Sequence, residues 1–213
     1  MILMRLVVGP LQVNCYILAD EKTKEAVVID PGDDAQDILG IVRKKGLTVK
    51  YIVNTHGHFD HLGGNTFLKN GTGAELVIHE KDSHMLTDPA ANMSTLFVDP
   101  VISVPADIVI HEENTVLEIG TYAFRVMHVP GHTEGSIALY NEAKKVLFSG
   151  DLIFNGSVGR TDFPGGSAKK LENSLKKVLK LPHDITIYPG HEEPFKLSDV
   201  EAYTTHIFES LDV

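Results

Sequence analysis

The chain has 213 residues, of which 43% are hydrophobic and 23% are charged, a length and composition typical of one compact globular domain. Its net charge of −10 disfavours nucleic acid as a partner, because such binding relies on Lys and Arg to neutralise phosphates. No apolar run approaches the roughly 20 residues of a membrane span, and the single cysteine, Cys15, excludes an internal disulfide. We therefore expect one domain over residues 1–213, in which Cys15 is a buried inert thiol. A chain without a disulfide also fits the reducing cytoplasm, where we expect the protein to be.

The first part of the sequence alternates strand-like runs with turns. Apolar runs bounded by turn residues predict strands over residues 2–8, 13–18, 26–29, 49–54 and 75–78. Arg5 lies inside the first run, so we expect a strand there and not a signal peptide. An amphipathic helix is predicted after the third run, with Asp33 or Asp34 as its N-cap and Gly46 at its end. Its apolar face consists of Ala35, Ile38, Leu39 and Val42.

The second part returns to strands between two long loops. Residues 86–106 show little periodicity, and Met93 and Phe97 within them are expected to form either a lid or wall over a site or a passive surface loop. Strands are predicted from Ile108 to Phe148, with an interruption at His128–Gly135, and again over Ile185–Tyr188. A second amphipathic helix carries Leu171, Leu175, Val178 and Leu179 and ends before Pro182. A last helical segment is predicted near Val200–Leu211.

The densest cluster of potential ligands lies in the stretch His56-Gly-His58-Phe-Asp60-His61. Imidazole and carboxylate together suit a divalent transition metal such as zinc, iron or manganese. His56 and His58 are two residues apart, so on an extended segment they face the same side and can share one metal. Asp60 and His61 follow a bend and can serve a second metal. Gly57 removes a side chain that would crowd this approach.

Three more ligand types each stand beside a glycine just past a predicted strand. They are His132 in Pro-Gly-His-Thr, Asp151 in Gly-Asp, and His191 in Pro-Gly-His. Rigid strands aim such loop residues into a site at the ends of the sheets in a layered protein of helices and sheets.

With these motifs in this order, the chain resembles the metallo-β-lactamase superfamily over almost its whole length. The resemblance implies an α+β, four-layer αββα fold with the site at one edge of a β-sandwich. It implies one metal on His56, His58 and His132 and a second on Asp60, His61 and His191, with Asp151 bridging both. We expect two divalent ions, zinc first, with iron or manganese as alternatives.

A narrower resemblance comes from the loop Gly156–Gly166 and from Asn14-Cys15-Tyr16, which are similar to the short members of the glyoxalase II-like branch. That branch hydrolyses thioesters such as S-lactoylglutathione. By this resemblance the partner is a small-molecule thioester, attacked by a hydroxide bridging the metals. Asp60 and Asp151 are the expected catalytic residues, Asp60 by orienting the nucleophile or taking up its proton. Only 22 residues follow His191, so the extra helical domain by which full-length glyoxalase II helps to hold glutathione has no counterpart.

Other functions remain open at this point. Persulfide dioxygenases share the fold and a stretch like Gly159–Phe163, and use one iron on residues that match His56, His132 and Asp151. Pro164-Gly165-Gly166 is more similar to the hydrolase branch. A lactonase or β-lactamase is a further alternative, although the lack of a recognisable export signal argues against a secreted β-lactamase. Nucleic-acid processing and pure binding are disfavoured by the charge and by the complete ligand set.

The remaining polar residues are given structural roles. Arg160 and Asp162 either contact an anionic substrate or the metal shell, or form a salt bridge that pins their loop, and we favour the salt bridge. Phe163 is expected to pack and not to serve as a substrate platform. Six histidines lack the setting of a ligand cluster and are expected to be structural or exposed: His79, His84, His111, His128, His183 and His206.

Overall fold

Two six-stranded sheets form the centre of the molecule in this computed structural model, which describes residues 1–111, 113 and 115–200. The first sheet follows chain order with β1 (Ile2–Val8), β2 (Val13–Ala19), β3 (Glu25–Ile29), β4 (Thr48–Val53), β5 (Glu75–His79) and β6 (Ile108–Ile110). Strands β1 to β3 pair antiparallel, and β3 to β6 pair parallel. The carboxyl ends of β3, β4 and β5 therefore meet at one edge of the sheet.

The second sheet runs in the order β12-β11-β10-β9-β8-β7. Its strands are β7 (Val116–Ile119), β8 (Tyr122–His128), β9 (Ile137–Asn141), β10 (Val146–Gly150), β11 (Thr186–Pro189) and β12 (Phe195–Lys196). Only β10 and β11 pair parallel, and the other neighbours are antiparallel. Since β10 and β11 run in the same direction, their ends also lie side by side.

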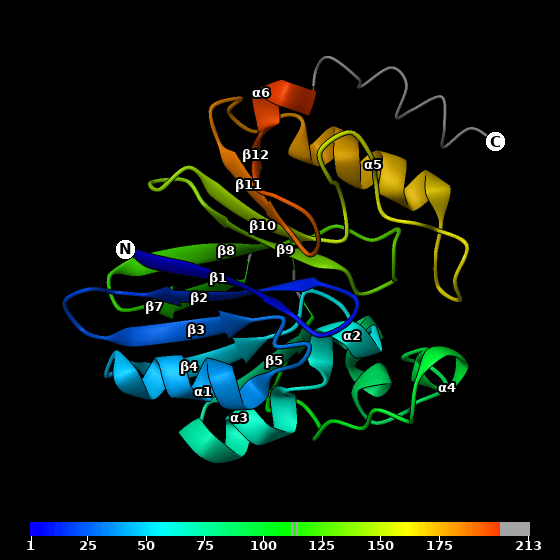
Figure 1. Cartoon of the computed structure of the whole chain (residues 1–213). Coiled ribbons are helices and arrows are strands. Elements are labelled where there is room, and N and C mark those ends of the chain that lie inside the picture. Colours follow the sequence, from blue (N-terminus) through cyan, green and yellow to red (C-terminus); the bar gives the residue numbers. More distant parts are fainter. Residues whose placement is uncertain (112, 114, 201–213) are drawn as a thin grey trace.

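Helices cover the outer face of each sheet, as Figure 1 shows. Near the first sheet lie α1 (Ala35–Lys44), α2 (Phe59–Leu62), α3 (Asn65–Thr72), the 3₁₀ helix η1 (Glu80–Leu86) and α4 (Ser94–Phe97); α5 (Ala168–Val178) and α6 (Leu197–Val200) cover the second sheet. None of the helices in the described part of the chain has the length and hydropathy that crossing a bilayer requires.

Three apolar layers hold these elements together. Ile38 of α1 and Leu68 of α3 pack on the first sheet, and Leu171 of α5 packs on the second. Between the sheets, Tyr16, Phe124 and Phe148 are the largest side chains in a buried cluster, where Tyr16 meets Phe148 edge-on at 5.1 Å. The four-layer αββα architecture expected from the resemblance is confirmed.

The strands for which a range was predicted lie within one or two residues of it, and β12 was not predicted. Asp34 is the N-cap residue of the first helix, as expected, but its side chain does not cap the helix. Asp34 has φ of 51° and makes no capping bond; its Oδ2 accepts a hydrogen bond from the backbone of Gly9 instead. Asp33 accepts only from the backbone of Asp34. The loop after β1 competes for these carboxylates, a contact that local sequence does not reveal. Gly46 does end the helix, with φ of 62°.

Two further predictions concern Cys15 and the C-terminal helical segment. Cys15 is fully buried and free, as predicted. The helical segment near Val200–Leu211 lies outside the described residues, apart from Val200 at the end of α6.

Candidate metal centre

The first part of the site is a loop at the carboxyl end of β4. His56 and His58 follow this strand, and α2 carries Asp60 and His61 one turn later. The loop after β3 packs so closely on α2 that a Cβ at Gly32 would lie 1.7 Å from the carbonyl oxygen of Asp60. Only glycine permits this approach, which fixes α2 against the sheet edge. Gly57 is crowded as predicted, because a Cβ there would meet Met85 at 2.6 Å.

The second part comes from three strand ends of the other sheet. His132 follows β8, Asp151 follows β10 and His191 follows β11. The His191 loop is anchored to the first sheet, since Asn14 Nδ2 donates to the carbonyls of Pro189 at 3.0 Å and Glu192 at 2.7 Å. Tyr16 Oη also donates to the Pro189 carbonyl, at 2.7 Å. These bonds position a ligand from one sheet relative to the other.

All seven predicted site residues converge. Their side chains form three groups in which the potential ligand atoms lie within 4.8 Å of one another. The groups are His56, His58 and His132; His56, His61 and Asp151; and Asp60, His61 and His191. The first and third are the two ligand sets that the resemblance implies, which the fold brings together from positions up to 135 residues apart.

Asp151 lies between the two sets. Its Oδ2 is 3.7 Å from His132 Nε2 and 3.5 Å from His191 Nε2, and its Oδ1 is 3.6 Å from His61 Nε2. A carboxylate that reaches both sets could bridge two cations, the role that the resemblance implies for this residue.

Four histidines are held by the ring nitrogen that faces away from this centre. His132 Nδ1 lies 2.8 Å from the carbonyl of Arg160, and His191 Nδ1 lies 3.1 Å from the carbonyl of Leu11. His56 Nδ1 is 3.1 Å from Thr55 Oγ1, and His61 Nδ1 is 3.1 Å from Asp30 Oδ2. Outer partners of this kind fix the ring orientation, and the carbonyls also fix the tautomer, so Nε2 of His132 and His191 carries no proton and faces the centre. His132 Nε2 lies 2.9 Å from His58 Nδ1, and a metal held by both rings would replace this contact.

The inward atoms fit a metal better than they fit one another. The nitrogens His56 Nε2 and His61 Nε2, together with Asp151 Oδ1, are buried and make no hydrogen bond within the described part of the chain. Such atoms carry a desolvation cost of about 1–3 kcal/mol each unless a partner is present. Nitrogen and carboxylate donors around two points match the preference of zinc, iron and manganese. The residues present therefore fit the divalent ions that the resemblance implies.

The pKa shifts of His58 and His61, one from each ligand set, also fit a bound cation. Burial, followed by the neighbouring His132, lowers the pKa of His58 to about 3, so its ring is a neutral donor at pH 7. Burial also disfavours charge on His61, but Asp60, Asp151 and Asp30 together outweigh it and raise the pKa of His61 to about 10. The carboxylate side of the centre thus favours positive charge, which a divalent ion supplies.

Two supporting carboxylates were missed by the sequence analysis. Asp30 accepts from Thr55 N and Thr55 Oγ1, both at 2.7 Å, directly before His56. Asp82 accepts from Gly57 N at 3.0 Å, Thr133 Oγ1 at 2.6 Å and Gly135 N at 2.7 Å, and so joins the two histidine loops. Asp30 shares with Asp151 a place just past a strand end, a signal that could have found it. Asp82 carries no such signal.

A cavity of about 570 Å³ opens over these ligands. Its walls include Leu11, Phe59, Met93, Phe97 and Phe163, whose side chains are apolar. Met93 and Phe97 thus belong to the wall, one of the two roles considered for their loop. Phe163 was expected only to pack, but it also lines this cavity. Its ring meets that of His58 edge-on, with the centroids 5.8 Å apart.

The loop after Asp151 is pinned by an ion pair. Arg160 donates from Nε and Nη2 to the two carboxylate oxygens of Asp162, both at 2.7 Å, which confirms the favoured salt bridge. The guanidinium also lies over the ring of Phe163 at 3.7 Å. Both charged side chains are exposed, so the pair orders the loop more than it adds stability.

The other histidines within the described residues lie outside the three ligand groups. His79 and His128 stack on each other, with ring centroids 4.2 Å apart, and His111 pairs with Glu80 at 2.9 Å. His206 lies outside the described residues.

The sequence and fold match known proteins along most of the chain. The profile of the metallo-beta-lactamase superfamily matches residues 8–191. An uncharacterized protein of Aquifex aeolicus (strain VF5) is 38% identical over 213 residues, which cover 100% of both chains. The hydroxyacylglutathione hydrolase GloC of Haemophilus influenzae is 35% identical over 182 residues, 84% of this chain and 85% of that protein.

Solved structures show the same arrangement. The BLEG-1 B3 metallo-beta-lactamase superposes with a TM-score of 0.90 at 36% identity, covering 94% of this chain and 97% of its own. TTHA1623 in a di-iron-bound form superposes with a TM-score of 0.82 at 34% identity, covering 93% of this chain and 96% of its own. ETHE1 from Myxococcus xanthus superposes with a TM-score of 0.79 at 26% identity, covering 98% of this chain and 85% of its own.

Proposed function

Because the chain belongs to the metallo-beta-lactamase superfamily, we propose that it is a metal-dependent hydrolase that cleaves small-molecule thioesters such as S-lactoylglutathione. The observation that carries this proposal is the convergence of seven side chains into two ligand sets joined by Asp151. The similarity to a hydroxyacylglutathione hydrolase supports the thioester. The reaction is proposed for the cytoplasm, with neither nucleic acid nor a membrane as a partner.

Each ligand set has its own place in this proposal. His56, His58 and His132 would hold one divalent ion, and Asp60, His61 and His191 the other, with Asp151 on both. Two such ions activate a water molecule and polarise the carbonyl that it attacks. Zinc is the first choice for a site of imidazole and carboxylate, with iron or manganese as alternatives; one similar protein was solved in a di-iron-bound form.

The chain supplies the proton handling and the shape of the site. Asp60 lines the catalytic cavity, with its Oδ2 3.5 Å from His191 Nε2, so it can orient the attacking water and take up its proton. Water oxygen adds to the acyl carbon, the carbon–sulfur bond breaks, and a carboxylic acid and a thiol result. Because a thiolate leaves readily, no separate general acid is required.

The test is a panel of thioesters, lactones, β-lactams and persulfides assayed on protein whose metal content is measured. We expect thioester cleavage with two ions per chain, and loss of metal and activity together in His58→Ala and Asp151→Ala. His84→Ala is the matched control, since this exposed histidine lies outside the ligand groups.

Two results would redirect the assignment. Oxygen consumption with a persulfide and one iron per chain would identify a dioxygenase that uses His56, His132 and Asp151. Turnover of a β-lactam in preference to every thioester would identify a β-lactamase, the activity named for one of the similar structures. Full activity of metal-depleted Asp151→Ala protein would refute metal-dependent hydrolysis altogether.

A further inference from the structure

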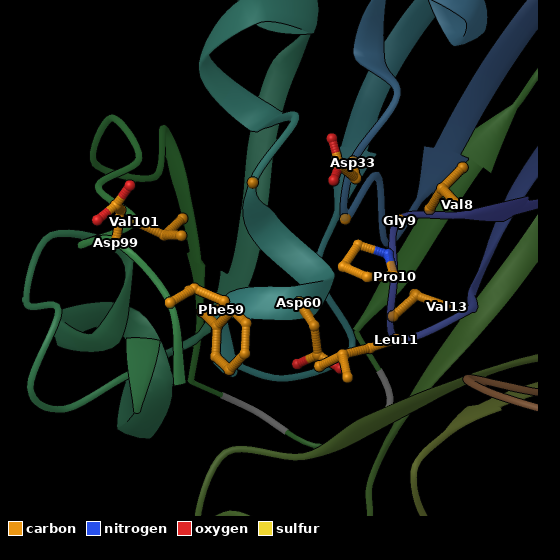
Figure 2. A pocket seen from close by; sticks show the side chains of 13 residues that line it. Val8, Gly9, Pro10, Leu11, Val13, Asp33, Phe59, Asp60, Asp99 and Val101 are labelled. Atoms are coloured by element: carbon orange, nitrogen blue, oxygen red, sulfur yellow. The ribbon is translucent and has the colours of Figure 1, made fainter. Parts of the chain in front are cut away.

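A second cavity of about 360 Å³ adjoins the catalytic one. The two share the walls formed by Pro10, Leu11, Phe59, Asp60 and Val98, so they meet along one side that includes the candidate ligand Asp60. Figure 2 shows the loop with Gly9, Pro10 and Leu11 on one side of this side chamber and Asp99 and Val101 on the other, with Phe59 and Asp60 between them. A substrate bound at the ligand sets can therefore extend one arm into this space.

The lining of the side chamber is apolar, with acidic groups as its only charges. Val8, Val13 and Val101 contribute aliphatic surface beyond the shared walls. Asp33 and Asp99 join Asp60 as the ionisable residues, and no lysine or arginine lines the chamber among the described residues. In the catalytic cavity the one guanidinium, Arg160, is already paired bidentately with Asp162. Among the described residues, neither cavity therefore offers an unpaired lysine or arginine side chain to a carboxylate on a substrate.

Hydrogen bonds hold the walls in place. Gln12 N donates to the carbonyl of Gly9 at 3.1 Å, and the carbonyl of Leu11 faces His191 Nδ1 at 3.1 Å. On the far side, Phe59 N donates to the carbonyl of Asn92 at 3.1 Å. Because backbone groups of both walls are hydrogen-bonded, the chamber is preformed, as ligand sites usually are.

From this geometry we propose that the side chamber is a subsite for one uncharged, apolar arm of the substrate, a specificity that rests on the proposed thioester hydrolysis. The arm is either the acyl chain or the thiol substituent. The chamber selects against arms that end in a carboxylate, because Asp33 and Asp99 line it beyond the candidate metal ligand Asp60 and no lysine or arginine among the described residues does. Thioesters of neutral thiols or with aliphatic acyl groups are therefore better substrates than a thioester that must place a carboxylate there.

The first experiment lengthens each arm separately on the metal-loaded enzyme. Thioesters of N-acetylcysteamine vary the acyl chain from acetyl to octanoyl, and S-acetyl alkanethiols vary the thiol. We expect kcat/KM to rise by up to about fourfold per methylene in one series until the chamber is full, the free energy of burying a CH₂ group. Replacing the terminal methyl of the best arm by a carboxylate lowers kcat/KM at least about tenfold.

Two variants of one wall residue test the chamber directly. Val98 lines both cavities and is 43% exposed, while Ile102 is 63% exposed and lines neither. Val98→Trp should flatten the dependence on chain length, and Val98→Lys should raise kcat/KM for the carboxylate-ended arm about tenfold. Ile102→Trp and Ile102→Lys are the matched controls and should do neither.

A binding measurement separates this proposal from the reaction. Uncleavable S-alkyl N-acetylcysteamine thioethers of increasing length, titrated calorimetrically, should bind more tightly with each methylene and with a negative heat-capacity change, and Val98→Trp should abolish the trend. Equal affinity for every length, together with no effect of either arm on turnover, overturns the subsite. Absence of all thioester cleavage, with the length-dependent binding intact, overturns the proposed function and leaves the subsite standing.

Discussion

Alanine at position 190 should displace the bridging carboxylate of the site without straining the backbone. Gly190 is not among the residues with positive φ, so alanine can adopt its conformation. An added Cβ would nevertheless lie 2.1 Å from Asp151 Oδ1 and 2.9 Å from His61 Cε1. The peptide itself is held at both ends, since Gly190 N donates to Gly150 at 2.9 Å and its carbonyl accepts from Asn14 N at 2.7 Å.

The size of the displacement follows from these contacts. Cβ atoms essentially never come within 3.0 Å of a heavy atom outside their own and the adjacent residues, so the Asp151 carboxylate must retreat by about 0.9 Å, several times the roughly 0.2 Å that a metal–ligand distance tolerates. A misplacement of this size lowers catalytic rates on the order of 100-fold. We expect Gly190→Ala to lose about that factor in kcat/KM and one of its two ions, while His56, His58 and His132 keep the other.

Metal analysis and thioester turnover of the purified variant check this prediction. Gly40→Ala is the control, because Gly40 lies in α1 with no atom within 4 Å of an added Cβ. That change should leave both readouts unaltered and raise the free energy of unfolding by about 0.5–1 kcal/mol, the usual gain on replacing a helical glycine. Gly190→Ala protein with two ions and normal turnover would show that the position of Asp151 does not control the site.

Three further predictions concern the surroundings of the site. Asp82→Asn keeps the shape of the side chain but cannot accept all three hydrogen bonds, so it should lower the free energy of unfolding in urea by about 1–3 kcal/mol and weaken metal binding; an unchanged unfolding midpoint would contradict this. Burial, then His128, lowers the pKa of His79 to about 4, so stability present above pH 6.5, where the unfolded histidine is neutral, should be lost as the pH falls towards 4. In His79→Gln, the free energy of unfolding from denaturation curves at pH 7, 6 and 5 should change less with pH than in the unchanged protein. The same pH dependence in both proteins would refute this role of His79. Chelation of the metal should lower the melting temperature, since a ligand bound only by the folded state stabilises it, and re-addition of zinc should restore the original value.

Much of the fold could be predicted because its signals are local. Strand β1 matches its predicted range of residues 2–8, and β2 and β3 each extend theirs by one residue. The apolar runs are continuous because strands between two layers are buried on both faces. The candidate ligands could be singled out for a related reason: they lie in loops or in a short helix that follow strand ends, and the resemblance implied how they combine.

What was missed depends on contacts between distant segments. The carboxylate of Asp34 is taken by Gly9 and not by its own helix. Asp82 was invisible because its three donors come from loops 25 to 53 residues away. Helix α3 (Asn65–Thr72), which was not predicted, begins directly after Gly63-Gly64. A Cβ at Gly64 would lie 2.6 Å from the carbonyl of Pro31, so these glycines allow close packing as well as a change of direction.

The two parts of the site are held in different ways, and this difference indicates where substrate preference resides. The ligand loops are tied from behind by buried groups such as Asp30, Asp82 and Tyr16, whose bonds join separate loops or the two sheets. The cavity wall is built differently, since Leu11 and Phe97 are 50% and 57% exposed and their side chains contribute apolar surface alone. A change at these exposed wall residues costs little stability because few buried contacts are lost, whereas a change behind the candidate ligands would disturb the metal geometry. Substitutions in the wall can therefore alter which acyl or thiol group is accepted while the hydrolytic centre stays the same.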